Sequence, residues 1–221
     1  MVIVMLGAQG SGKGTVGIEL AKELKLAYIS TGEIFREHIQ NNTELGKEAN
    51  LYISAGNLVP DELTTKILLD RLSKQDVLDN GALIDGYPRT KEQCETLDDI
   101  LAKLNKKVDV AVNLRVDYEE LIRRITNRRL CSSCKKGYNI EYNPPKNEGV
   151  CDICGGTVVQ RADDIPEAVK NRLDIYYVNE KPVLDYYEQK GVLRIEKAGD
   201  KVGRTSKDVT EDLLGNLSKG R

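Results

Sequence analysis

The chain has 221 residues, of which 40% are hydrophobic and 31% are charged, a composition typical of a globular protein with a buried core. Its formal net charge of −2 argues against broad non-specific binding to nucleic acid. No apolar run is long enough to span a membrane, and the first residues lack the basic start of a signal peptide, so we expect a cytoplasmic protein with neither a membrane nor a nucleic-acid partner.

Short buried-strand patterns alternate with helical patterns along the chain. Continuous apolar runs predict strands over residues 1–6, 27–29, 82–85, 108–116 and 192–195. Apolar residues at helical spacing predict one helix from Val16 onward and others over residues 32–40, 61–73, 91–104, 118–129 and 166–189. Alternation of this kind predicts an α/β fold, in which a parallel five-stranded sheet carries helices on both faces.

The first predicted strand runs into a glycine loop. Its sequence, Gly7-Ala8-Gln9-Gly10-Ser11-Gly12-Lys13, matches the phosphate-binding spacing G-x-x-x-x-G-K. Glycines let backbone N–H groups curl around a phosphate, the next helix presents its positive N-terminal end, and Lys13 supplies a mobile charge. Gly14 and Thr15 follow, so the hydroxyl comes one position later than in the general motif.

Two arginines in the next segments, Arg36 and Arg89, point to a second anionic ligand. Ser30 and Glu33 have the spacing of a capping box that starts a helix. Arg36 lies one turn into that helix, where it can meet an anion. Arg89 follows a proline turn, which aims its guanidinium.

Two further side chains near this turn have specific chemistry. Asp85 ends a predicted buried strand, where a carboxylate can hold magnesium through water, as in other phosphate-loop enzymes. Gln93 lies one helical turn after Arg89, and its amide can both donate to and accept from an adenine edge.

Residues 127–164 break the alternation of strands and helices. This stretch is rich in Cys, Gly, Pro, Asn and Lys, and it is too long for a plain loop, so we predict a small inserted subdomain. Its cysteines, Cys131-x2-Cys134-x16-Cys151-x2-Cys154, have the spacing of a four-thiolate zinc site. Four protein ligands leave no position for water, so the zinc is predicted to be structural.

These motifs resemble those of nucleoside monophosphate kinases, above all the adenylate kinase family. G-K-G-T at 12–15, S-T-G-E-x-x-R at 30–36 and D-G-Y-P-R at 85–89 are similar to the family's signatures. The resemblance covers nearly the whole chain, and some members of the family carry a zinc-bearing lid that is similar to the insert. Gln9 departs from the family's pattern, in which proline is usual.

The resemblance implies roles for individual residues. Phosphate gripping and catalysis are implied for Lys13, Arg89, Arg124, Arg128, Arg161 and Arg172. ATP contacts are implied for Gly10, Ser11, Gly12, Lys13, Gly14, Thr15, Arg128, Gly137, Tyr138 and Asp200. AMP contacts are implied for Thr31, Arg36, Asn57, Leu58, Val59, Gly86, Tyr87, Pro88, Arg89, Gln93, Arg161 and Arg172. Asp163 and Asp164 are similar to the family's hinge acids.

The predicted activity is therefore reversible, magnesium-dependent phosphoryl transfer in which ATP and AMP give two ADP, carried out by a monomer. The predicted segments are a core (1–29, 60–126 and 165–221), an AMP-binding segment (30–59) and a zinc-binding lid (127–164). Two alternatives stay open, a kinase for UMP or CMP and a zinc-ribbon nucleic-acid-binding protein with an ATPase core. Gln93 and the long insert favour AMP over the first, and the charge balance and the D-G-Y-P-R segment argue against the second.

Overall fold

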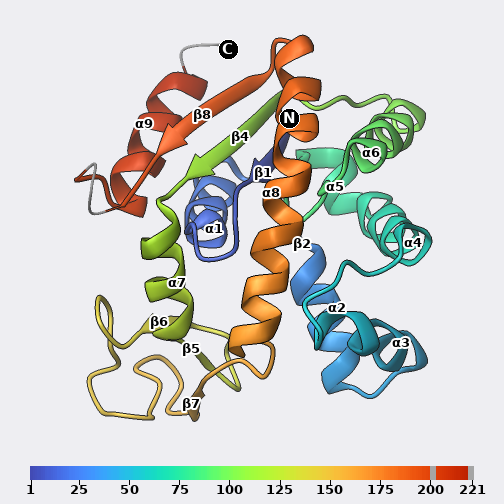
Figure 1. Cartoon of the computed structure of the whole chain (residues 1–221). Coiled ribbons are helices and arrows are strands. Elements are labelled where there is room, and N and C mark those ends of the chain that lie inside the picture. The colour runs from blue at the N-terminus through green and yellow to red at the C-terminus, as the bar shows by residue number, and fades with distance from the viewer. Residues whose placement is uncertain (200–202, 219–221) are drawn as a thin grey trace.

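A parallel sheet of five strands lies at the centre of the molecule (Figure 1). The computed structural model describes residues 1–199 and 203–218. The strands are β1 (Val2–Leu6), β2 (Ala27–Ser30), β3 (Ala82–Asp85), β4 (Val110–Arg115) and β8 (Leu193–Lys197), and they lie in the order β2-β3-β1-β4-β8. The predicted fold class, a parallel five-stranded sheet, is confirmed.

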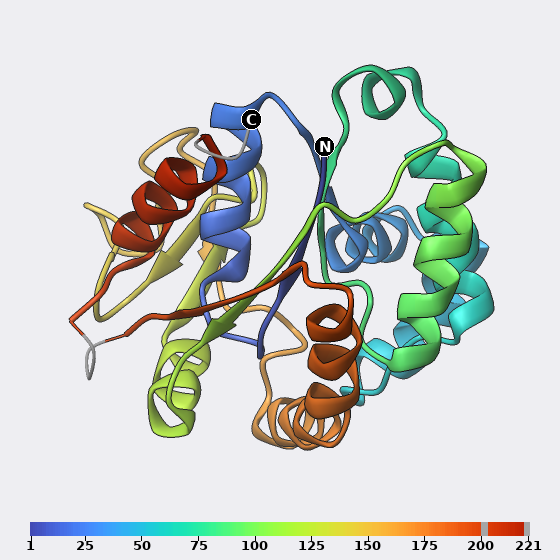
Figure 2. The ribbon, with the colours of Figure 1, turned by 90° about the horizontal axis from the view of Figure 1, so that it is seen from above.

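The central strand of this sheet, β1, is apolar at every position. Both faces of the sheet are therefore covered by helices. Side chains alternate along a strand, so Ile3 and Met5 face one layer while Val2 and Val4 face the other. On the first face lie α1 (Lys13–Leu24) and α9 (Ser206–Ser218). On the second lie α4 (Asp61–Leu72), α5 (Gln75–Asn80), α6 (Lys91–Lys103) and α8 (Pro166–Gln189), and Figure 2 shows α1 and α9 across the sheet from α6 and α8.

The parallel arrangement brings the predicted motifs to one edge of the sheet. Strand β1 leads into the glycine loop, β2 ends at Ser30 and β3 ends at Asp85. The register pairs Ser30 and Met5 with Asp85 from either side. Ligands of open α/β sheets bind at this carboxyl edge.

Residues 30–59 form a helical projection from the core. It contains α2 (Thr31–Gln40) and α3 (Glu44–Ile53), which pack through a small cluster that includes Phe35, Ala49 and Val59. The side chain of Ser30 accepts from the N–H of Glu33 at 3.4 Å, so the predicted helix start is confirmed. Helices α3, α5 and α9 were not predicted from the sequence.

The insert forms a second, antiparallel sheet below α7 (Tyr118–Thr126), with β5 (Arg128–Cys131), β6 (Gly137–Asn139) and β7 (Val158–Val159) in the order β6-β5-β7 (Figure 1). The predicted helix over 118–129 was therefore too long. It ends at Thr126 because the backbone from Arg128 onward pairs with β6, where Arg128 is opposite Asn139. Within the described part of the chain, no helix has the length and apolar content needed to cross a membrane.

Candidate functional site

A cleft of about 1210 Å³ lies at the carboxyl edge of the central sheet, between the core, the α2–α3 projection and the insert. Its walls include most of the predicted nucleotide-site residues. These are Gly10, Gly12, Lys13, Gly14, Thr15, Thr31, Arg36, Asn57, Leu58, Val59, Asp85, Gly86, Pro88, Arg89, Gln93, Arg124, Arg128, Gly137, Tyr138, Arg161 and Arg172. Residues far apart in the sequence thus share one cavity.

Three predicted ligand residues are not among these wall residues. Tyr87 is 1% exposed and packs in the core between the sheet and its helices, which leaves only its backbone for a ligand. Ser11 is also buried, and its hydroxyl has no hydrogen-bond partner among the described residues. Asp200 lies outside the described residues.

The glycine loop leaves the start of α1 open to an anion. Gly12 caps the helix with a φ of 91°, a left-handed conformation that favours glycine, and no side chain caps the first turn. The first N–H groups of α1 are therefore available for a phosphate. The Lys13 ammonium donates to the carbonyl of Ala8 at 3.2 Å.

Lys13 carries a strongly shifted pKa. Burial in the cleft lowers its pKa to about 8, although the carboxylate of Asp85 opposes the shift. The guanidinium groups of Arg89, Arg128 and Arg161 add to the lowering because like charges disfavour the ammonium. Because the cleft destabilises the Lys13 ammonium, it is suited to an anionic ligand, which would favour the protonated form of Lys13.

Asp85 fits the predicted magnesium role in its donor chemistry. The Tyr28 hydroxyl donates to its Oδ2 at 2.9 Å. The other oxygen, Oδ1, is buried without a partner among the described residues. A buried carboxylate oxygen with a free lone pair can accept from a magnesium-bound water.

Carboxylates hold several arginines of the cleft in position. Glu33 pairs with Arg36 at 2.5 Å and with Arg161 at 2.9 Å. Asp163 pairs with Arg172 at 2.8 Å. Burial and the neighbouring Arg36 lower the pKa of Arg161 to about 10, so positive charge is in excess here.

Arg128 and Asp164 form a two-point ion pair at the boundary between insert and core. The guanidinium of Arg128 donates to the two carboxylate oxygens of Asp164 at 2.8 and 2.5 Å. Gln9 of the glycine loop joins this pair, because its Nε2 donates to Asp164 at 2.9 Å while its Oε1 accepts from Arg172 at 3.3 Å. Gln9 was not predicted as a site residue, and its departure from the family pattern was the signal that the sequence offered.

Gln93 is buried at the opposite end of the cleft. Its Oε1 accepts from the backbone N–H of Arg89 at 2.7 Å, and its Nε2 donates to Asp61 at 2.6 Å. Each of these groups keeps one further donor or acceptor position. The amide is thus fixed in orientation and can still read a base edge.

The loop before α4 packs closely on α8. A side chain at Gly56 would meet the carbonyl of Ala168, because an added Cβ would lie 2.3 Å from that oxygen. Asn171 donates to the side chain of Asn57 at 2.7 Å, and Arg172 donates to the carbonyl of Ile53 at 2.8 Å. These contacts connect the α2–α3 projection to the helix that follows the insert.

Arg124 has different surroundings from the other predicted arginines. Its guanidinium pairs with Glu120 at 2.5 Å and donates to the carbonyl of Ser11 at 3.4 Å. It lies near Ser206 beside Gly12. The neighbouring wall residues Arg204, Thr205 and Ser206 were not predicted from the sequence, because they belong to no recognisable motif.

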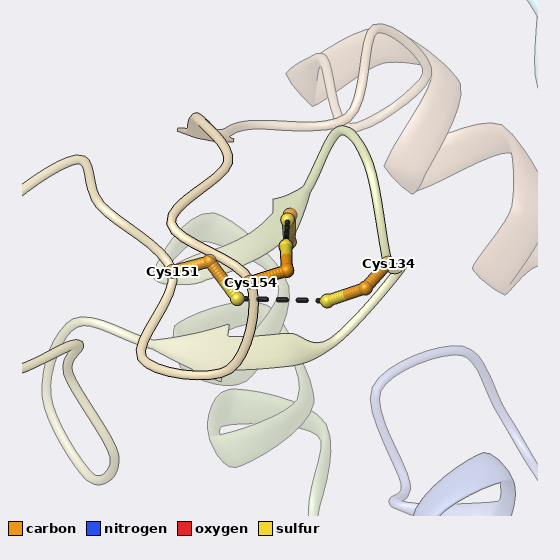
Figure 3. A group of neighbouring side chains, drawn as sticks. Cys134, Cys151 and Cys154 are labelled. Carbon is orange, nitrogen blue, oxygen red and sulfur yellow. Dashed lines mark hydrogen bonds between the residues drawn. The ribbon is translucent and has the colours of Figure 1, made fainter.

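The four paired cysteines come together in the insert, apart from the cleft. Their sulfur atoms all lie within 4.8 Å of one another. Cys134 and Cys151 point toward each other (Figure 3). The sulfurs of this pair lie 3.5 Å apart, as do the sulfurs of Cys131 and Cys154. A tetrahedral zinc with bonds of about 2.3 Å needs sulfurs roughly 3.8 Å apart, so the cluster fits a zinc ion.

Tyr138 connects this cluster to the cleft. It lines the cleft, while its hydroxyl lies 3.3 Å from the sulfur of Cys151. That hydrogen bond is the largest of the contacts that lower the pKa of Cys151, to about 6. The fifth cysteine, Cys94, is fully buried in the core, and burial raises the pKa of its thiol to about 12, as expected for a packing residue.

Comparison with known proteins gives consistent matches. A family model described as adenylate kinase matches residues 5–192. Similar curated proteins named adenylate kinase come from Caldicellulosiruptor bescii (45% identical over 96% of this chain and 99% of that protein) and Staphylococcus aureus (46% over 98% and 100%). Another comes from Ruminiclostridium cellulolyticum (45% over 96% and 99%). The similarity spans the core, the α2–α3 projection and the insert.

Proposed function

The chain belongs to the adenylate kinase family of phosphotransferases, and we propose that its cleft transfers a phosphoryl group reversibly between ATP and AMP, giving two ADP. One observation carries the proposal. A phosphate loop and a set of arginines from several separate segments surround a single cavity, which also contains a buried amide at its far end.

The donor nucleotide is assigned to the phosphate-loop side of the cleft. The open N-terminus of α1 and Lys13 would bind the β- and γ-phosphates of ATP. Gly137 and Tyr138 of the insert line the same cavity and would cover the nucleotide. Arg124 and Ser206 lie beside Gly12 at this end.

The acceptor is assigned to the opposite side, between α2 and α6. Arg36 and Arg89 would bind the phosphate of AMP, and Thr31 lies next to them at the start of α2. The amide of Gln93 would pair with the adenine edge through its remaining donor and acceptor positions. This assignment favours AMP over UMP and CMP, because a base that does not match the remaining donor and acceptor positions of this buried amide would leave them unpaired.

Phosphoryl transfer needs two phosphates in line, neutralised charge and little water. The charge that spreads over the transferring group would be stabilised by Lys13, Arg89, Arg124, Arg128, Arg161 and Arg172. Magnesium, when bound, neutralises oxygens of ATP, and Asp85 would hold its water shell. No side chain of this chain has to act as a nucleophile.

We assign residues 127–164 to a lid over ATP, residues 30–59 to a segment over AMP, and the rest to the core. Two contacts between the lid and α2 support closure over the cleft. Arg161 pairs with Glu33 at 2.9 Å, and Lys135 donates to Gln40 at 2.8 Å. Closure keeps water from accepting the phosphoryl group, which is the general purpose of lids in enzymes of this family.

Zinc is assigned a structural role in the lid. Four thiolates fill a tetrahedral site and leave no position for an activated water. None of these cysteines lines the cleft described above. We also expect the chain to act as a monomer, because all of the residues assigned to the site come from one copy.

The proposal is tested by an assay that couples ADP formation to NADH oxidation, with ATP as donor and AMP, UMP or CMP as acceptor. Turnover with AMP and little with UMP or CMP would support it. Equal turnover with the three acceptors would favour a broader kinase for nucleoside monophosphates. ATP hydrolysis without an acceptor, together with tight RNA or DNA binding at physiological salt, would favour the nucleic-acid-binding alternative.

A further inference from the structure

Gln9 contacts charged groups from two other segments of the chain through its side-chain amide. We propose that it is a positioning residue, which ties the phosphate loop to the end of the lid and holds Arg128 and Arg172 in place before ATP binds. This inference rests on the proposed function, because it concerns the same cleft. It assigns a role to a position where the resemblance to the family supplies none.

The donor half of the amide completes the surroundings of Asp164. The side chain of Asp164 is fully buried, with an exposed fraction of 0%. Arg128 donates to both of its oxygens, and Gln9 supplies a third donor at 2.9 Å, to Oδ1. Because a buried carboxylate is costly unless its lone pairs are satisfied, this third bond stabilises the orientation that aims Arg128 along the cleft.

The acceptor half of the amide orients Arg172 without neutralising it. Arg172 pairs with the carboxylate of Asp163 at 2.8 Å, and its other terminal nitrogen donates to the Gln9 carbonyl at 3.3 Å. An amide is uncharged, so it holds the guanidinium without adding a second negative charge to that of Asp163. A glutamate here would compete with the phosphate, and a proline would provide neither bond.

Loss of these bonds is expected to weaken ATP binding rather than the chemical step. A ligand that binds one arrangement of a site has an apparent affinity proportional to the population of that arrangement. A hydrogen bond to a charged group contributes a net free energy that changes an equilibrium constant roughly tenfold. The phosphate loop and arginines would remain intact, so turnover at saturating ATP should persist.

The test compares Gln9→Met with Gln160→Met. Methionine keeps the length of glutamine but removes the donor and the carbonyl. Gln160 is an exposed matched control, because it donates to the backbone carbonyl of Asp164 at 3.1 Å and does not contact the carboxylate. We expect Gln9→Met to raise the KM for ATP about 10-fold with kcat within about twofold of wild type, and Gln160→Met to resemble wild type.

Amide hydrogen exchange of the nucleotide-free protein gives a readout that needs no activity. In Gln9→Met, exchange in the lid (127–164) and at the start of α8 should be faster than in wild type. Gln9→Glu keeps an acceptor for Arg172 but places a second carboxylate against Asp164, so its KM for ATP should exceed that of Gln9→Met.

The proposal is overturned if Gln9→Met matches wild type in both KM and exchange, or if kcat falls while KM stays constant. It is also overturned if Gln160→Met shows the same changes, since the effect would then belong to the lid backbone. If the wild-type protein transfers no phosphoryl group, the proposed function fails, while the exchange comparison still decides the role of Gln9.

Discussion

The affinity for ATP is expected to fall as the pH rises above about 8, because Lys13 loses its proton in the free enzyme. Burial in the cleft lowers the pKa of this ammonium to about 8 from its ordinary value of 10.5. The phosphates of ATP favour the charged form, so the pKa is higher in the complex. Binding therefore takes up a proton above pH 8 and is insensitive to this group below pH 7.

The size of the effect follows from the same shift. If Lys13 is fully protonated in the complex, each pH unit above the pKa of the free enzyme raises Kd about tenfold, since one unit is about 1.4 kcal/mol. Near the pKa the dependence is shallower. Between pH 7 and 9 the Kd for ATP should thus rise about tenfold.

Isothermal titration calorimetry measures this directly. Titrations with ATP at pH 7 and 9, each in two buffers with different enthalpies of ionisation, give both Kd and the number of protons bound. Proton uptake should approach one at pH 9 and be near zero at pH 7. Lys13→Met serves as the control, because it should bind ATP more weakly at pH 7 and lose most of the uptake at pH 9.

Arg161 makes this control necessary. Its pKa is lowered to about 10, and any proton that it takes up on ATP binding remains in Lys13→Met. A Kd that is constant from pH 7 to 9 in the wild type, with no proton uptake, would refute the assigned electrostatics. Retention of the full proton uptake by Lys13→Met would refute the assignment to Lys13 as well.

Three other changes test the remaining assignments. Arg89→Ala should lower kcat by on the order of 10²–10³ with an unchanged circular dichroism spectrum; near wild-type turnover would remove Arg89 from the transfer site. The wild-type kcat/KM for AMP should exceed the values for UMP and CMP by at least roughly 100-fold. Gln93→Leu should reduce this preference for AMP. An unchanged preference would contradict the base-reading role of Gln93. The wild type should contain about one zinc per chain, and Cys151→Ser should lower the melting temperature while activity persists in the cold; metal-free protein that is folded but inactive would contradict a structural zinc.

The central sheet could be predicted because its strands are short, continuous and apolar. Val2, Val4 and Leu6 pack on one helical layer while Ile3 and Met5 pack on the other, so the strand reads as an unbroken apolar run. The cleft lies at the edge where these parallel strands end. Motifs some eighty residues apart in the sequence, such as the glycine loop and Asp85, therefore meet there.

The missed helices differ in the signals that the sequence carries. Helix α3 has Leu45, Ala49, Tyr52 and Ile53 at helical spacing, so its pattern was present in the sequence and was overlooked. Helix α5 has six residues, too few for a periodic pattern. The end of α7 was placed too late because arginine favours helices, while pairing of Arg128 and Arg129 with the next strand decides the structure.

The sequence predicted the arginines of the cleft, but not which acids form ion pairs with them. Arg161 and Glu33, for example, are 128 positions apart and pair because the insert meets α2 in the folded chain. A guanidinium enclosed without a partner would be strongly destabilising, so the closed cleft requires these carboxylates whenever no phosphate is present. A phosphate that binds at Arg161 or Arg172 must then replace a carboxylate rather than meet a free cation. The net gain from such a contact is the difference between two charge pairs, which limits how tightly these two arginines can hold a nucleotide.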